Sequence, residues 1–97
     1  MRELIFHPGA DAEFEEAMQW YRERNERAAE GFNSAVDAAL ADIQEHPERW
    51  PQFGSRHRHR ILKKYPYYIV YKFNDERIDV MAIAHAKRKP GYWSKRS

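Results

Sequence analysis

Residues 65–85 of this sequence read YPYYIVYKFNDERIDVMAIAH and contain its clearest structural pattern. The side chains of the first half alternate, which is typical of a strand. The four residues NDER then form a turn, and a second strand follows from Arg77 to His85. Because this second strand is apolar on both faces from Val80 to Ala84, it is predicted to be central in a sheet. In the first strand, one face is expected to carry Tyr67, Ile69, Tyr71 and Phe73, and the other Tyr68 and Val70.

The first half of the chain has a helical period instead. One helix is predicted to begin at Gly9 or Asp11, with acidic residues in its first turns, where the helix dipole favours them. Asn25 is a plausible N-cap for a second helix. His46 precedes Pro47, and this pair predicts the end of that helix. The two apolar stripes contain Phe14, Ala17, Met18 and Tyr21 in the first helix, and Phe32, Val36, Ala39, Leu40 and Ile43 in the second.

The remaining segments complete an α+β fold. RELIFH, residues 2–7, is predicted to be a short strand, and HRHRILKK, residues 57–64, a more polar one. The order is therefore β-α-α-β-β-β in a single domain, residues 1–97, with the short interhelical link giving an antiparallel helical hairpin. The hairpin must cover one face of a mainly antiparallel sheet to bury its stripes. We expect the N-terminal strand to pair with a strand of the C-terminal half, and the other sheet face to be left for a partner.

Composition narrows the class of protein. Apolar residues make up 42% of the chain, aromatic residues 14% and charged residues 33%, which is a globular composition. No apolar run approaches the roughly 18 residues that cross a bilayer, and the N-terminus does not resemble a signal peptide. There is no cysteine, so disulfides and thiolate metal sites are excluded. A cytoplasmic location fits these features.

The charges divide between the two halves of the chain. Residues 1–54 carry 5 basic and 12 acidic side chains, whereas residues 55–97 carry 12 basic and 3 acidic ones. The basic half is a candidate surface for phosphate or for an acidic partner, and the alternative is a solvated charged face with a basic tail. The basic and aromatic candidates are Arg56, Arg58, Arg60, Lys63, Lys64, Lys87, Arg88, Lys89, Tyr92 and Trp93.

Histidines and aromatic residues allow structural as well as functional interpretations. His57 and His59 share one side of a strand, and with His85 they could bind zinc, but the cations of RHRHR disfavour a metal and none is expected. His85 ends an apolar strand, where a buried histidine bonded to the backbone is as plausible as a site residue. Trp93 could stack on a base or fold back over the sheet edge. No glycine-rich phosphate loop and no other cofactor motif is present.

Four segments of the chain together resemble the RelE/ParE superfamily of bacterial toxins. ADAEFEEAMQWY is similar to the first helix of that family, and GFNSAVDAALADIQEHPERWP to its second helix and exit. RHRILKKYPYYIVYKF resembles its strand pair. IDVMAIAHAKRKPGYW resembles its last strand and C-terminal ending. The resemblance covers nearly the whole chain.

This resemblance implies a toxin of a type II toxin–antitoxin module. RelE-like members are metal-independent ribonucleases that cut mRNA on the ribosome, whereas ParE-like members inhibit DNA gyrase without cleavage. In both branches a cognate antitoxin wraps the toxin, and operator DNA is bound only through the antitoxin. No cofactor and no membrane are implied. The alternative to an enzyme is a non-catalytic binding module, which is either a gyrase inhibitor or a detoxified chain that serves only in operon autorepression.

The resemblance also implies roles for individual residues. In a ribonuclease, Arg60, Lys63, Arg88 and Tyr92 would be catalytic, and would assist the attack of a ribose 2′-OH on the adjacent phosphate. Contacts to RNA or to a partner would come from Arg56, Arg58, Lys64, His85, Lys87 and Trp93. If Arg60, Arg88 and Tyr92 converge on one basic cleft, the enzyme is favoured. If Tyr92 and Trp93 are buried in packing, the binding module is favoured.

Overall fold

A five-stranded sheet in the order β1-β5-β4-β3-β2 forms the centre of the computed structural model, which describes residues 1–97. β5 lies between β1 and β4, and its residues from Val80 to Ala84 are buried. The central position predicted for this strand is therefore confirmed. The strands are β1 (Glu3–Phe6), β2 (Gln52–Phe53), β3 (His57–Ile61), β4 (Tyr67–Phe73) and β5 (Arg77–His85).

β1 is the one strand that runs parallel to its neighbour. It pairs with the first half of β5, from Glu3 opposite Arg77 to Phe6 opposite Val80, whereas all other strand pairs are antiparallel. The pairing of the N-terminal strand with the C-terminal half is confirmed. β1 stops where Pro8 begins a helix, so the second half of β5 has no strand on that edge.

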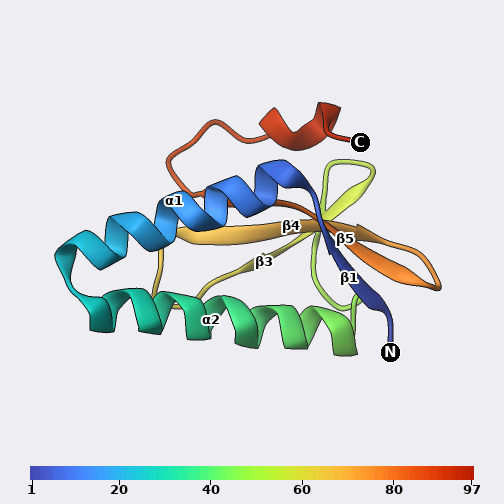
Figure 1. Ribbon diagram of the computed structural model, residues 1–97. Coiled ribbons are helices and arrows are strands. Elements are labelled where there is room, and N and C mark those ends of the chain that lie inside the picture. The colour runs from blue at the N-terminus through green and yellow to red at the C-terminus, as the bar shows by residue number, and fades with distance from the viewer.

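Two helices follow β1 and cover one face of the sheet (Figure 1). α1 (Pro8–Arg24) starts earlier than expected, because the His7 side chain caps it by accepting a hydrogen bond from the Gly9 N–H, and proline fits the first helical position. Asn25 alone links α1 to α2 (Glu26–Glu45) and caps α2 by accepting from the Ala28 N–H at 2.7 Å, as predicted. The core between helices and sheet contains both predicted helix stripes, together with Ile69, Tyr71, Ile78, Val80 and Ile83.

The opposite face of the sheet is partly covered by the end of the chain, which corrects the prediction of a wholly free face. Residues 86–97 turn back from β5 and cross the side of the sheet away from α2 (Figure 1). They include a short 3₁₀ helix, Tyr92–Lys95, whose Trp93 is only 2% exposed. Trp93 packs in a second apolar cluster with Tyr68, Val70, Met81, Ala82 and Ala84. A large indole that would otherwise face water is thus used to cover apolar strand residues.

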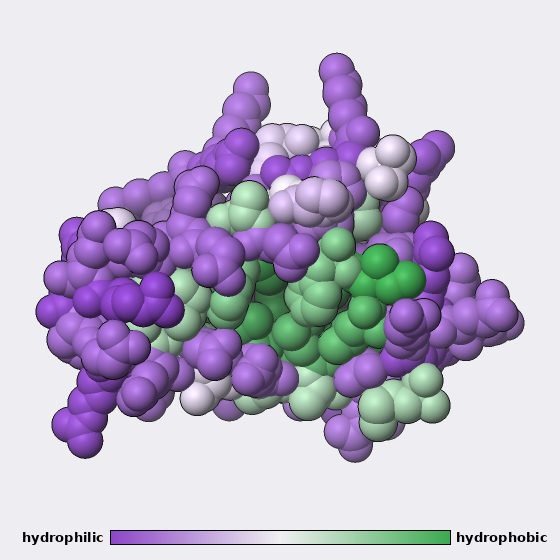
Figure 2. Space-filling model, in the orientation of Figure 1, coloured by the Kyte–Doolittle hydropathy of each residue, from purple (hydrophilic) through white to green (hydrophobic).

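Two other details of the strands differ from the prediction. β3 ends at Ile61, so Lys63 and Lys64 lie in the connection to β4 rather than in a strand. β2 was not foreseen, because two residues carry too little alternation to be recognised. In Figure 2, apolar surface is visible in the space between the two helices, with hydrophilic surface around it. Neither helix is long and apolar enough to span a membrane.

Candidate functional site

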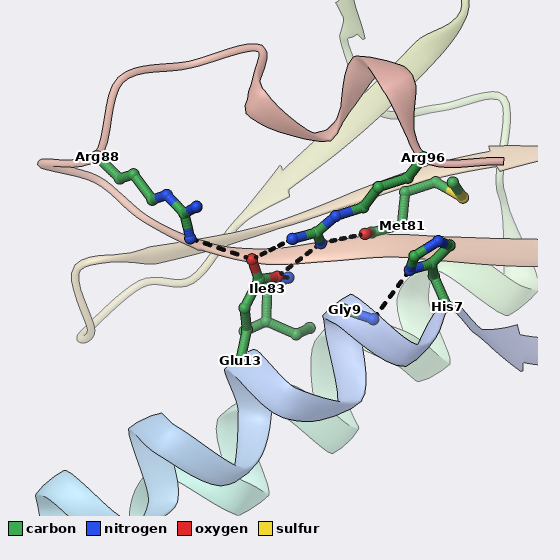
Figure 3. A network of polar contacts seen from close by, with 7 residues as sticks. All are labelled: His7, Gly9, Glu13, Met81, Ile83, Arg88 and Arg96. Carbon is green, nitrogen blue, oxygen red and sulfur yellow. Dashed lines mark hydrogen bonds and ion pairs between the residues drawn. The ribbon is translucent and has the colours of Figure 1, made fainter.

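Glu13 is the centre of the most extensive polar network in the molecule (Figure 3). Its carboxylate accepts two hydrogen bonds from the Arg96 guanidinium, at 2.9 and 3.1 Å, and a longer one from Arg88 at 3.4 Å. It also accepts from the backbone N–H of Ile83 at 3.0 Å. The Glu13 side chain is 12% exposed and that of Arg96 is 19% exposed. Helix α1, strand β5 and the C-terminal segment therefore meet at one mostly buried ion pair.

This network completes the edge of β5 beyond the end of β1. Arg96 donates to the carbonyl of Met81 at 2.8 Å, and Glu13 accepts from the N–H of Ile83 two residues further on. Alternate residues of a strand direct their backbone groups to the same edge. The pair Glu13 and Arg96 thus supplies the acceptor and the donor that a longer β1 would have supplied. Arg96 also lies against the start of α1, since a Cβ at Gly9 would be 2.5 Å from its Cζ.

Two of the proposed catalytic residues are held by this network. The Arg88 guanidinium lies 3.5 Å from the centroid of the Tyr92 ring, and that of Arg96 lies 5.0 Å from it. The Tyr92 hydroxyl is buried near the Glu13 carboxylate without completing a hydrogen bond. Burial, and then the neighbouring carboxylate, raise the pKa of this hydroxyl well above its ordinary value. Tyr92 is therefore a neutral, enclosed phenol at physiological pH.

Arg58 and Arg60 lie on the helix side of the sheet, not on the face expected for a partner. Each is opposite a core residue of β4, Tyr71 for Arg58 and Ile69 for Arg60. Arg58 donates to the carbonyl of Trp50 at 2.8 Å. Arg60 pairs with Asp42 of α2 at 3.0 Å, lies over the Trp50 ring and is 18% exposed. Both cations join β3 to the end of α2 and its exit.

The other predicted cations are exposed. Arg56 lies in the turn before β3, and Lys63, Lys64 and Lys87 lie in connections; their side chains make no hydrogen bond or ion pair. Lys63 lies near Arg60, because both line a cavity of about 250 Å³ beside α2. Arg60 contacts Asp42 on β3's side of the molecule, whereas Arg88 and Tyr92 contact Glu13 at the far edge of β5. The strands β4 and β5 lie between these two groups and place them roughly 10 Å apart across the sheet.

A comparison with known protein families shows to which family this chain belongs. A family model described as "ParE toxin of type II toxin-antitoxin system, parDE" matches residues 4–90, which is most of the chain. The chain belongs to the ParE toxin family. It is the toxin component of a type II toxin–antitoxin system, in which a toxin has a cognate antitoxin as its partner.

Individual relatives agree with the ParE assignment. Toxin ParE2 of Mycobacterium tuberculosis, from strains CDC 1551 / Oshkosh and ATCC 25618 / H37Rv, is 29% identical over 90 residues, which is 92% of this chain and 86% of the relative. A solved chain of the chromosomal ParDE TA system from P. aeruginosa has a TM-score of 0.76 at 14% identity, covering 90% of this chain and 98% of that one. The latter likeness shows a shared fold. The superfamily expected from the sequence is confirmed, and the family match selects its ParE branch.

The histidines of this ParE-family toxin do not gather at one point. His57 and His59 face the side of the sheet that carries Trp93, whereas His85 contacts Tyr67 on the helix side. His85 is half-buried, and its Nδ1 accepts a hydrogen bond from the Lys87 backbone N–H at 3.0 Å. The sequence left two roles open for His85, a histidine bonded to the backbone or a residue of a functional site, and the bond to the backbone is observed.

Sequence reasoning missed Glu13 and Arg96, the two residues at the centre of this toxin's polar network. Glu13 was one of several acidic residues near a helix start, where exposure to solvent is the usual interpretation. Arg96 lies 83 positions away, one residue before the end of the chain. No local spacing connects the two, so only the fold could identify them. The one available signal was the length of the apolar run in β5. This strand is longer than β1, so the backbone groups at its edge need partners beyond the end of β1.

Proposed function

We propose that this ParE-family toxin acts by binding a protein target, DNA gyrase, and not by cleaving RNA. The proposed site of action is therefore cytoplasmic. The observation that carries the proposal is the state of Tyr92, whose hydroxyl is buried and has a raised pKa. A general acid or base must be able to reach the proton that it transfers, and it works best with a pKa near the operating pH. Tyr92 meets neither condition.

The placement of the cations supports the same proposal. A ribonuclease site would need Arg60, Arg88 and Tyr92 around one phosphate, because their charges must act on the same transition state. Here Arg60 is paired with Asp42, and Arg88 faces Glu13. Each cation already has a carboxylate, and the two carboxylates belong to different helices. Trp93 is buried in packing, which is the arrangement that favours a binding module.

The proposal is tested by separating the two possible targets in one experiment. Induced expression of the wild-type chain should arrest growth, and co-expression of the protein encoded by the adjacent gene should restore it. The purified toxin should inhibit supercoiling of relaxed plasmid by gyrase. It should leave ribosome-bound mRNA uncut when primer extension is used to map the ends.

Tyr92→Phe provides the matched variant. It removes only a hydroxyl that has no hydrogen-bond partner, so the protein should fold and growth arrest should persist. Cleavage of mRNA by the wild type that is lost in Tyr92→Phe would overturn the proposal in favour of a ribonuclease. Gyrase that remains fully active at saturating toxin would also overturn it.

A further inference from the structure

Two adjoining cavities lie beside β3, on the sheet face that carries Trp93. The first has a volume of about 500 Å³ and lies between the turn before β3 and the C-terminal segment, with Arg56 and His57 in its lining. The second has a volume of about 310 Å³ and extends past Ile61 towards the start of β4. Phe53 and Pro90 line both cavities. We call these two adjoining cavities together the β3 groove.

The two ends of the β3 groove differ in chemistry. Six of the nine residues of the second cavity are hydrophobic, and Ile61 there is 59% exposed, one of three large apolar side chains with such exposure. The first cavity is more polar, and Arg56 at its rim has no ionic partner. No aspartate or glutamate lines either cavity. The groove therefore suits an occupant that is apolar at one end and acidic at the other.

His57 supports an acidic occupant at the first cavity. It is 8% exposed, and its Nε2 is buried without a hydrogen-bond partner. Burial, and then the nearby cations Lys72 and Arg56, lower the pKa of His57. The positive potential that disfavours a proton on His57 would attract a carboxylate.

The backbone of β3 is open along the same groove. The N–H of Leu62 donates to Tyr67 of β4, so the backbone groups of His59 and Ile61 face away from β4. The N–H of His59 donates to the Pro51 carbonyl at 3.0 Å, but proline has no N–H to return to the His59 carbonyl. Beyond this point β2 has ended, and the Ile61 N–H has no partner. The Ile61 carbonyl accepts from the Arg60 side chain at 2.8 Å. The His59 carbonyl and the Ile61 N–H are therefore the two free backbone groups at this edge.

We propose that the β3 groove is the docking site for an extended segment of the cognate antitoxin, which adds to the sheet at His59 and Ile61. A branched or aromatic side chain of the segment packs on Ile61 and Tyr68, and a carboxylate pairs with Arg56. A peptide fits better than a nucleic acid, because an open strand edge needs backbone N–H and C=O groups, which nucleic acids lack. This inference rests on the proposed toxin function, but it is tested by antitoxin affinity and not by growth arrest or gyrase activity.

The test measures the dissociation constant of the purified toxin and the antitoxin from the adjacent gene. Ile61→Asp should weaken binding at least about 30-fold, the scale of losing a central apolar contact, and Arg56→Glu about 10-fold. Arg27→Glu in α2 and Ala12→Asp in α1 make matched charge changes at exposed positions away from the β3 groove and should stay within about threefold. In the complex, hydrogen exchange of the Ile61 amide should slow, because that N–H gains a partner.

Each outcome decides the matter. Full affinity of Ile61→Asp, with an unchanged circular dichroism spectrum, would overturn the docking site. An unprotected Ile61 amide in the complex would overturn the strand addition. Loss of affinity in Arg27→Glu or Ala12→Asp instead would place the antitoxin on the helices. Competition between the antitoxin and a single-stranded RNA oligonucleotide that fails with Arg56→Glu would assign the groove to nucleic acid.

Growth assays keep this proposal separate from the proposed function. Cells that express Ile61→Asp without antitoxin should still arrest, and the antitoxin should no longer rescue them. Wild-type toxin that binds its antitoxin through the β3 groove but never arrests growth would refute the function and leave the docking site intact.

Discussion

At the scale of single residues, Glu13 joins three parts of the chain that are far apart in sequence. We expect Glu13→Gln to lower the free energy of unfolding by about 2 to 3 kcal/mol, because the amide keeps one acceptor but leaves the Arg96 guanidinium without its counter-charge in a mostly buried position. Urea unfolding followed by circular dichroism measures the change.

Glu23→Gln is the matched control for this substitution. Glu23 is exposed and contacts only Gln19, so its loss should change the unfolding free energy by less than about 0.5 kcal/mol. Equal stability of the two variants would show that the Glu13 network does not hold the C-terminal segment.

Tyr71 is the second residue with a measurable energetic signature. It is fully buried and donates to the Pro47 carbonyl at 2.6 Å, and burial is the main cause that raises its pKa from 10.0 to about 12. The unfolded chain loses this proton near pH 10 but the folded protein only near pH 12. The stability contribution is therefore complete below pH 10 and is lost as the pH rises through 12, at about 1.4 kcal/mol per pH unit.

Tyr71→Phe isolates this effect. It should destabilise the protein by about 1 to 2 kcal/mol at pH 7, because the Pro47 carbonyl loses its donor. Between pH 10 and 12 its unfolding free energy should fall less steeply than that of the wild type, since all other titrating groups are shared. Parallel slopes in urea titrations across this range would refute the assignment.

At the scale of elements, the C-terminal segment is a structural layer and not a loose tail. Trp93 is 2% exposed and covers residues of β4 and β5 on the face opposite the helices. We expect Trp93→Ala to destabilise the protein by about 3 kcal/mol, through lost burial and the cavity that remains. Thermal or urea unfolding measures this loss, and dye binding should report the newly exposed apolar strands.

Trp20→Ala is the same chemical change at the exposed end of α1. Trp20 is 48% exposed, and its main partner is the Arg24 guanidinium, 3.4 Å from its ring. Its loss should be below about 1 kcal/mol. A Trp93 variant as stable as the Trp20 variant would mean that residues 86–97 do not cover the sheet in solution.

At the scale of the whole molecule, the fold decides which cations remain available. Arg58, Arg60, Arg77, Arg88 and Arg96 of the basic half already have protein partners. The unpaired ones are Arg56 and the six lysines Lys63, Lys64, Lys72, Lys87, Lys89 and Lys95. These free charges should steer an acidic antitoxin segment, so the association rate should fall at least about tenfold from about 50 to 500 mM salt, as the Debye length shortens roughly threefold.

Stopped-flow measurement of association and dissociation rates tests this prediction. The dissociation rate should change little, since apolar contacts control release. An association rate that is independent of salt would show that the free cations do not guide docking.

The helices and strands of this toxin could be predicted from its sequence, because the patterns that indicate them are local. Side-chain periods of 3.6 and 2 predicted both helices and four of the five strands, β1, β3, β4 and β5. Asn25 predicted the helix link, and alternation separated Ile69 and Tyr71 from Tyr68 and Val70. The family resemblance rested on the same segments. The face that each set occupies depends on how the strands and helices assemble, and so does the orientation of Arg58 and Arg60 towards the helices. The pairing of Glu13 with Arg96 also depends on this assembly. The second half of β5 has no neighbouring strand beyond β1, so its backbone groups need other partners, and this need arises only once the strands are assembled.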